Sequence, residues 1–339
     1  MKTLLLAATT VVVAASLLSS CKTDPSSANG PQAILPLNSH GGGSAPAHPQ
    51  LVYVGGKTIS HNQYETIAVM DSDGSHQTTL YTAPASISGT TYACANLKAA
   101  CWSPSGGSIA WLEADTIKAL DVTVNSSGVP VASNIRVIYT NGGSETMNGL
   151  AWCSGTSTSA LAFTAYHAGP TSELYTVPQS GGSATTIASE TSGGVFSSPT
   201  WSPDDSKIGT MQIIAGTSGE CKLWVLSASG SLLETDTFST LAQTKNCEWA
   251  RSGNTIAFGG QETGGAQHVY YIDYGSGTGP YTQSVTGDMP SWNPTNATIM
   301  FTNISASPWS LQKITAFGSS ASTITTTPAL NAGCRWRRQ

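Results

Sequence analysis

A short sequence motif built around a tryptophan recurs along this chain of 339 residues and limits the folds that the chain can adopt. Four copies align without gaps, a fifth aligns with two extra residues, and the end of the chain supplies a sixth tryptophan. A fixed period of this kind indicates a repeat architecture. The copies are CWSPSGGSIAW (101–111), AWCSGTSTSALAF (151–163), TWSPDDSKIGT (200–210), EWARSGNTIAF (248–258), SWNPTNATIMF (291–301) and CRW (334–336).

The columns of this alignment predict a tight turn followed by a strand. Proline, which presets φ for a turn, stands two residues after three of the tryptophans. Apolar residues then recur at alternate positions, which is typical of a strand with one buried face. Four residues after the tryptophans of the ungapped copies stand types that tolerate a left-handed backbone, namely Gly106, Asp205, Gly253 and Asn296.

The spacing predicts a closed ring of blades. Successive tryptophans are 50, 49, 48, 43 and 44 residues apart, close to the length of a four-stranded propeller blade. Residues 51–56 and the following strand match the second and third strands of a unit that lacks its first strand, whereas 334–339 form a first strand alone. The sequence therefore predicts an all-β, six-bladed β-propeller whose last blade pairs the C-terminal strand with the N-terminal strands, leaving no open seam.

These phrases resemble the TolB-type WD40-like (PD40) repeat, a tryptophan followed by Ser-Pro-Asp-Gly and an apolar strand. Trp102 and Trp201 begin the copies that match it best. The resemblance implies a propeller over nearly all of the folded region and a protein-binding role in the bacterial envelope. TolB of the Tol-Pal system also has an α/β domain ahead of its propeller, and this sequence has a linker there instead.

The first fifty residues predict export and a tether. Residues 1–20 have a basic start at Lys2 and a mainly apolar run, typical of a signal peptide. Leu18-Ser19-Ser20-Cys21 resembles the lipobox of bacterial lipoproteins, which implies lipidation of Cys21; an ordinary cleaved signal and an uncleaved anchor helix are the alternatives. Residues 21–50 are rich in Ser, Gly, Pro and Ala and predict a flexible linker, so the propeller is expected over 51–339. Lys22, which is not the inner-membrane retention aspartate, favours the outer membrane.

Charge and cysteine content limit the partners. Lys2 is the only charged residue in the predicted signal, so the mature chain has 13 basic and 19 acidic residues and a net charge of −6. Nucleic acid is an unsuitable partner because it requires a basic footprint. Six cysteines remain after Cys21, and oxidising conditions favour disulfides. Among fifteen possible pairings, we expect Cys94 with Cys101 and Cys221 with Cys247, since each pair needs loops on one end of the ring only.

Sequence motifs favour a non-enzymatic role. Gly-x-Ser-x-Gly and His-Glu-x-x-His are absent from the sequence, and the histidines show no ligand spacing, so we expect no catalytic residue, cofactor or metal site. The tryptophans are expected in the core between blades.

Function is therefore expected on the end of the ring where the second-to-third-strand and blade-to-blade connections emerge. The leading hypothesis is a monomeric, lipid-anchored scaffold that binds an envelope protein there. A glycan-binding lipoprotein and, third, a lyase-type or lactonase-type enzyme are the alternatives. The predicted contacts are Tyr166, His167, Lys245, Glu248, Glu262 and Asp288.

Overall fold

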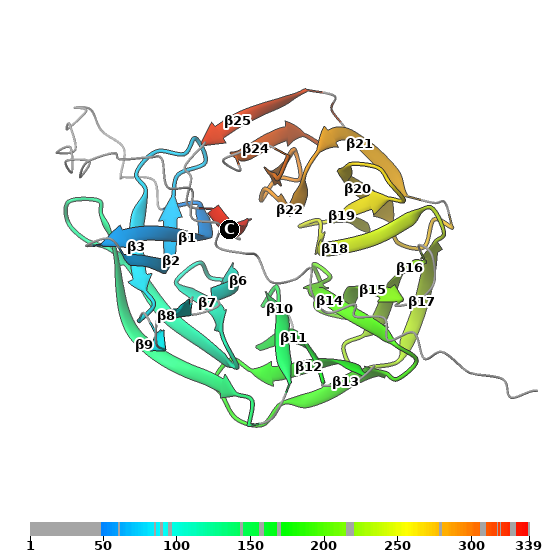
Figure 1. The fold of residues 1–339 in the computed structure, drawn as a ribbon, viewed down its shortest axis with the longest axis horizontal. Coiled ribbons are helices and arrows are strands. Elements are labelled where there is room, and N and C mark those ends of the chain that lie inside the picture. The colour runs from blue at the N-terminus through cyan, green and yellow to red at the C-terminus, as the bar shows by residue number, and fades with distance from the viewer. Residues whose placement is uncertain are drawn as a thin grey trace, which may run out of the picture. The chain divides into compact units, whose positions relative to one another are not determined.

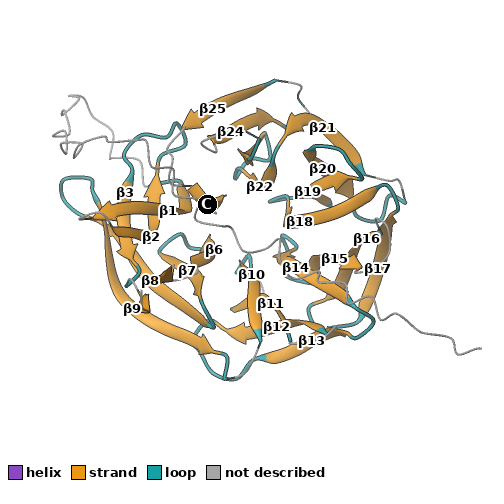
Figure 2. Cartoon of the chain, in the orientation of Figure 1, coloured by secondary structure: helices purple, strands orange, loops and turns teal. Residues whose placement is uncertain are grey.

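The computed structural model contains six four-stranded antiparallel sheets arranged as the blades of a ring, and a two-stranded sheet (Figure 1). It describes residues 49–337 except 60–61, 85, 89–90, 94–96, 143–144, 156–158, 168–170, 215–219, 278–279, 306–309, 317, 319 and 326–329. Within these residues the secondary structure consists of strands, and Figure 2 shows strands and loops throughout the coloured ribbon. The predicted six-bladed propeller is confirmed.

Five blades follow the chain in order, with the tryptophan strand innermost. The first two are formed by β6 (Leu97–Trp102), β7 (Ser108–Glu113), β8 (Thr116–Val124) and β9 (Pro130–Thr140), and by β10 (Thr146–Trp152), β11 (Ala160–Tyr166), β12 (Ser172–Pro178) and β13 (Thr185–Glu190). The next is formed by β14 (Gly194–Trp201), β15 (Lys207–Ile214), β16 (Cys221–Ser227) and β17 (Leu232–Phe238). The last two are formed by β18 (Leu241–Trp249), β19 (Thr255–Glu262), β20 (Gln267–Asp273) and β21 (Tyr281–Thr286), and by β22 (Asp288–Trp292), β23 (Thr298–Asn303), β24 (Ser310–Thr315) and β25 (Ala321–Thr325). β4 (Ser86–Ser88) pairs with β5 (Thr91–Ala93).

The sixth blade joins both ends of the folded chain. Its strand order is β26-β1-β2-β3, so the last strand in sequence is the innermost of the sheet. The antiparallel register places Leu51 opposite Trp336 and Tyr53 opposite Cys334. The ring closure predicted from the sequence is confirmed, and we call this sheet the closing blade. Its strands are β26 (Leu330–Trp336), β1 (Leu51–Ile59), β2 (Asn62–Met70) and β3 (Thr78–Thr82).

The turn after each tryptophan adopts the predicted left-handed conformation. The backbone φ is 66° at Gly106, 59° at Asp205, 76° at Gly253 and 57° at Asn296. Residues with a Cβ rarely adopt this conformation, and Asn and Asp do so at lower cost than most. The residue types in this column of the repeat are therefore explained by backbone geometry.

The same turns connect neighbouring blades. The backbone N–H of Ser154 donates to the Asp205 carboxylate in the next blade, and the N–H of Arg251 donates to Asn296 Oδ1 at 2.7 Å. At Gly106, an added Cβ would lie 2.0 Å from Nε of Arg337, which follows β26. The turn residues thus fix the spacing between blades as well as the reversal of the chain.

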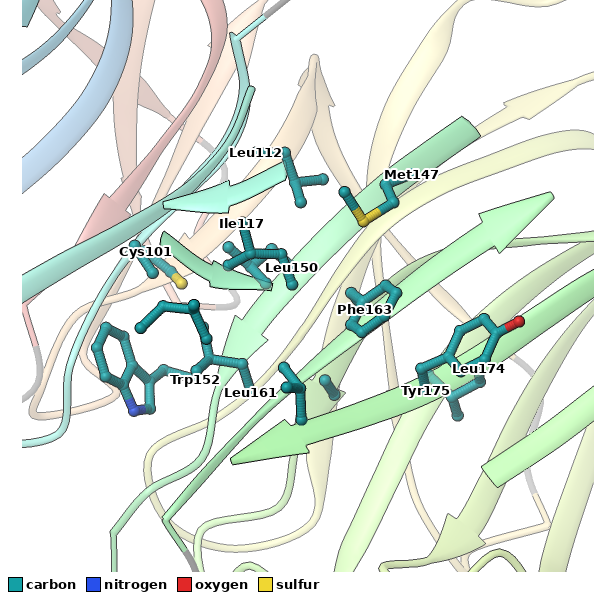
Figure 3. Close-up of a cluster of buried hydrophobic side chains, with 14 of the residues drawn as sticks. Cys101, Leu112, Ile117, Met147, Leu150, Trp152, Leu161, Phe163, Leu174 and Tyr175 are labelled. Atoms are coloured by element: carbon teal, nitrogen blue, oxygen red, sulfur yellow. The ribbon is translucent and has the colours of Figure 1, made fainter. Parts of the chain in front are cut away.

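The hydrophobic core lies between the faces of adjacent blades. Figure 3 shows one such layer, in which Cys101, Leu112 and Ile117 of one blade lie near Met147, Leu150 and Trp152 of the next. The six repeat tryptophans are all buried, as predicted, because a large ring covers much apolar area between two sheets. They are Trp102, Trp152, Trp201, Trp249, Trp292 and Trp336.

We predict that loss of β26 opens the ring. Deletion of residues 334–339 removes the buried Cys334 and Trp336 and exposes the edge of β1, so the melting temperature should fall sharply. Trp336→Ala alone should cost about 3–5 kcal/mol of unfolding free energy, as for other buried tryptophans. Deletion of residues 338–339 leaves β26 whole and is the matched control. A melting temperature equal to that of the intact chain after the longer deletion would contradict closure by β26.

Candidate functional site

One end of the ring carries both the blade-to-blade connections and the connections between second and third strands. Glu145, which directly precedes β10, has its Oε1 3.1 Å from Nδ1 of His167, which directly follows β11. The two kinds of connection therefore share an end, as the sequence predicted. We call this end the loop face, and the opposite end, where the tryptophan turns lie, the turn face.

On the loop face, His167 lies between two carboxylates. Its Nδ1 faces Glu145 and its Nε2 is 2.7 Å from Oε2 of Glu173 in β12. All three side chains are half-buried, with 30%, 18% and 21% of the side-chain surface exposed for His167, Glu145 and Glu173. One donor atom from each of the three can lie within 4.8 Å of the others. We call these three residues the His167 cluster.

Hydrogen bonds hold the carboxylate oxygens of this cluster. Nδ2 of Asn141 donates to Glu145 Oε2 at 2.9 Å, and the hydroxyls of Ser189 and Tyr175 donate to Glu173. Burial alone would raise the pKa of Glu173, but the hydrogen bonds from Tyr175, His167 and Ser189 outweigh it, and the pKa lies below its usual range. Burial and the Glu173 carboxylate raise the pKa of Tyr175, so its hydroxyl remains a donor. Glu173 is therefore a carboxylate across the physiological range.

Three other predicted contacts lie where a partner could reach them. Tyr166 is half-buried at the end of β11, directly before His167. Glu262 is exposed at the end of β19 and accepts a long hydrogen bond of 3.4 Å from the Tyr270 hydroxyl. Lys245 is half-buried within β18. The structure brings Tyr166 and His167 together, whereas Lys245 and Glu262 belong to a different blade.

The prediction that Asp288 is an exposed contact is wrong. Asp288 is 2% exposed at the start of β22, and burial raises the pKa of its carboxyl group. The Met289 N–H donates to its Oδ1 at 2.6 Å. A Cβ at Gly259 would lie 2.0 Å from the same oxygen. Asp288 therefore belongs to the packing between two blades, and glycine at position 259 makes room for it.

Glu248 is also not an exposed contact, because it is buried between two arginines. It is 4% exposed, its Oε1 lies 2.5 Å from Nη2 of Arg251, and its Oε2 accepts from Nη1 of Arg335. Arg251 also donates to the Trp292 carbonyl oxygen at 3.2 Å, and Arg335 to that of Pro290 at 3.3 Å. Glu248 comes from β18 and Arg335 from β26, so these ion pairs join the closing blade to a blade that is not its neighbour in the ring.

The ion pairs border a small cavity on the axis of the ring. Its lining comes from the inner strands of five blades and includes Cys101, Thr200, Glu248, Arg251 and Arg335. The cavity volume is about 30 Å³. A space of that size holds one or two waters, whereas sites for small organic ligands measure roughly 300–1,000 Å³. The axis at this level therefore has no room for a metabolite.

Every inner strand carries a register shift close to the axis, a feature that our sequence analysis missed. In the closing blade the shift lies in β26, between the pairs Tyr53–Cys334 and Gly55–Leu330, and in the other blades it falls just before the tryptophan. Such β-bulges redirect side chains and kink the strand. Three residues before the tryptophans stand Ala99, Gly149, Ser198, Asn246, Met289 and Gly333.

Residues at this position of the repeat contact their counterparts in the neighbouring blade. A Cβ at Gly149 would lie 2.3 Å from Cα of Ser198, and Ser198 Oγ donates to Oδ1 of Asn246 at 2.8 Å. Ala99, Asn246 and Met289 have positive φ. The two glycines and the asparagine at this position of the repeat are visible when the sequence is aligned on tryptophan, and they could have indicated the bulges.

The predicted disulfide between Cys221 and Cys247 is wrong, since both are buried free thiols. Sγ of Cys247 donates to the Ser198 carbonyl oxygen at 3.0 Å, and burial raises the pKa of this thiol to about 12. Cys221 begins β16, where burial also raises its pKa. Cys94 lies outside the described residues, so its predicted pairing with Cys101 remains untested.

No helix in the described part of the chain is long and apolar enough to cross a membrane. The signal predicted over 1–20, Cys21, and the linker predicted over 21–50 except for its last two residues lie outside that part. Lipidation of Cys21 therefore stays a prediction.

Comparison with known proteins points to one family. The TolB beta propeller domain (PD40) matches residues 45–336. Among solved structures, TolB from Acinetobacter baumannii superposes with a TM-score of 0.63 at 15% identity, over 86% of this chain and 67% of that chain. A protein designated TolB from Agrobacterium tumefaciens gives 0.58 at 13% identity, over 86% of this chain and 99% of that one. No curated protein matches the sequence. At these identities the structural likeness establishes the fold.

We predict that Glu248 stabilises the closed ring. Glu248→Gln removes the negative charge that both buried arginines require, so the unfolding free energy should fall by about 3–5 kcal/mol. Glu262→Gln changes an exposed glutamate and should stay within about 0.5 kcal/mol. Denaturant unfolding of the two variants measures both values. Equal stabilities for the two would show that the ion pairs contribute nothing to closure.

Proposed function

Because the chain belongs to the TolB beta propeller domain family, we propose that it is a non-enzymatic protein-binding module of the cell envelope that receives its partner on the loop face. Fold alone does not determine function, so the proposal depends on the two ends of the ring and its axis. The observation that carries it is the contrast between an axial cavity too small for a metabolite and a polar, accessible loop face.

The axis is unsuited to a substrate. The cavity there has a volume of about 30 Å³ and is bordered by Glu248, Arg251 and Arg335, whose charges are paired with one another. By contrast, Tyr166, His167 and Glu262 lie partly or fully exposed at the loop face. Tyrosine is a common anchor in protein interfaces because it combines apolar area with a hydroxyl group. A rigid blade that holds such residues in place loses less entropy on binding than a free loop would.

A lipid anchor at Cys21 completes the proposed arrangement. A linker over residues 21–50 would let the propeller reach a partner while the acylated cysteine holds the chain to a membrane. We expect the outer membrane.

Glycan binding is a second candidate, favoured by a groove on the turn face. The groove has a volume of about 590 Å³, within the usual range for small ligands. Its lining includes the hydroxyls of Ser103, Ser105 and Ser108 together with Asn134 and Arg136. Such donors suit sugar hydroxyls. Since this groove lies on the opposite end from Tyr166, the two candidates are separable by position.

We predict that a photo-crosslinking amino acid at Glu262 captures one envelope protein, whereas the same group at Ser180 does not. Both side chains are exposed, but Glu262 lies on the loop face and Ser180 in a turn on the turn face. Tyr166→Ala should weaken the crosslink from position 262. Capture from position 180 alone would show that the partner binds the turn face instead. Binding to a glycan array that is lost in Arg136→Ala would favour the second candidate.

We predict that Cys21→Ser releases the protein from membranes, because it removes the only residue that a lipobox would acylate. Fractionation of cells with alkaline washing measures the release, and Ser26→Ala in the linker is the control. If Cys21→Ser stays membrane-bound, an uncleaved helix over residues 1–20 holds the protein instead.

A further inference from the structure

We propose that Glu145, His167 and Glu173 form a binding site for a divalent transition-metal ion of the zinc class on the loop face. The site is independent of the identity of any protein partner. Our sequence analysis predicted no metal ligands, because the three residues have no motif spacing and meet only through strand pairing.

The register of three strands brings the ligands together. Thr146 of β10 pairs with Tyr166 of β11, which pairs in turn with Ser172 of β12. Glu145, His167 and Glu173 are the chain neighbours of these paired residues. The His167 N–H also donates to the Thr171 carbonyl oxygen at 3.0 Å, which closes the end of the hairpin. The three ligands therefore come from a rigid part of the blade.

The separation between His167 Nε2 and Glu173 suits a first coordination shell, and one ligand atom of Glu145 lies within 4.8 Å of the other two. Zinc bonds of about 2.0–2.1 Å to nitrogen and oxygen place tetrahedral ligands about 3.3 Å apart. The Nε2 to Glu173 and Nδ1 to Glu145 separations are 2.7 Å and 3.1 Å. One ring nitrogen and Glu173 can therefore bind the ion. Glu145 then either supplies the third ligand by rotation of its side chain or accepts from the other ring nitrogen, as carboxylates do beside many metal-bound histidines.

The charges around the cluster favour a cation. In the part of the chain that the structure describes, His167 is the cationic group that pairs with Glu145 or Glu173, and it is charged only when protonated. With a neutral imidazole, two carboxylates face one another across it in a half-buried position. A divalent ion neutralises the charges of both carboxylates.

The donor set selects among metals. Imidazole with carboxylates suits Zn²⁺ and similar transition metals, whereas Ca²⁺ and Mg²⁺ prefer all-oxygen sites. Asn141, Ser189 and Tyr175 hold the carboxylate oxygens in place. Outer partners of this kind maintain affinity by orienting the ligands. Two or three protein ligands leave at least one coordination position open.

Calorimetric titration of the untagged, detergent-solubilised full chain with Zn²⁺ tests the proposal. We expect one saturable site per chain, no equivalent binding of Mg²⁺ or Ca²⁺, and a higher melting temperature with Zn²⁺. His167→Ala should abolish this site, and Glu145→Gln and Glu173→Gln should weaken it by about 10- to 100-fold or more.

His76→Ala is the matched control. His76 lies on the surface with its Nδ1 2.7 Å from Oδ2 of Asp71, so the His76→Ala variant also removes a histidine that is paired with a carboxylate. Circular dichroism of each variant checks that the fold is kept. Equal Zn²⁺ affinity in His167→Ala and the intact chain would overturn the proposal. An intact chain without saturable Zn²⁺ binding would also overturn it and leave His167 as a hydrogen-bonding bridge between two carboxylates.

Discussion

The pairing of β26 with β1 is the interaction on which the rest of the structure depends. Each blade buries its faces only because another blade lies on either side, so a ring with one open seam would expose two apolar faces and two strand edges. In the closing blade, Leu51 pairs with Trp336 and Tyr53 with Cys334, so both ends of the folded chain share one sheet. This pairing also places Arg335 against Glu248, which a linear stack of blades would not allow.

Closure explains why function is expected on an end of the ring. The Glu248 ion pairs border a cavity of only about 30 Å³ on the axis, and the tryptophans are buried between blades, so the larger accessible surfaces lie at the rim and the two faces. The turn face holds short, hydrogen-bonded turns such as that at Asp205, whose carboxylate accepts from the turn of the preceding blade. The loop face holds Tyr166 and the His167 cluster. Polar groups that are not required for folding are thus found mainly where strands end.

Features that follow from a local residue pattern could be predicted from the sequence. Features that depend on how deeply a side chain is buried could not. Gly106 and Asn296 indicated turns because a left-handed backbone restricts residue type. The number of tryptophans predicted six blades, and the strand patterns of residues 51–56 and 334–339 predicted that the ring is closed. Glu248 and Asp288 were predicted as exposed contacts because charged residues near strand ends usually face solvent. In the structure both lie at β-bulges, which turn their side chains inward. The His167 cluster was missed because its members, 22 and 6 residues apart, meet through register alone.

Hydrogen exchange in native conditions tests the closed ring most directly. If β26 and β1 form one sheet within a cooperative ring, the amides of Cys334–Trp336 and Leu51–Tyr53 should exchange only through global unfolding, with the same free energy as amides of β15. Exchange of β26 by local opening at a much lower free energy, with β15 still protected, would contradict the account, because the ring would then be stable without its closing strand.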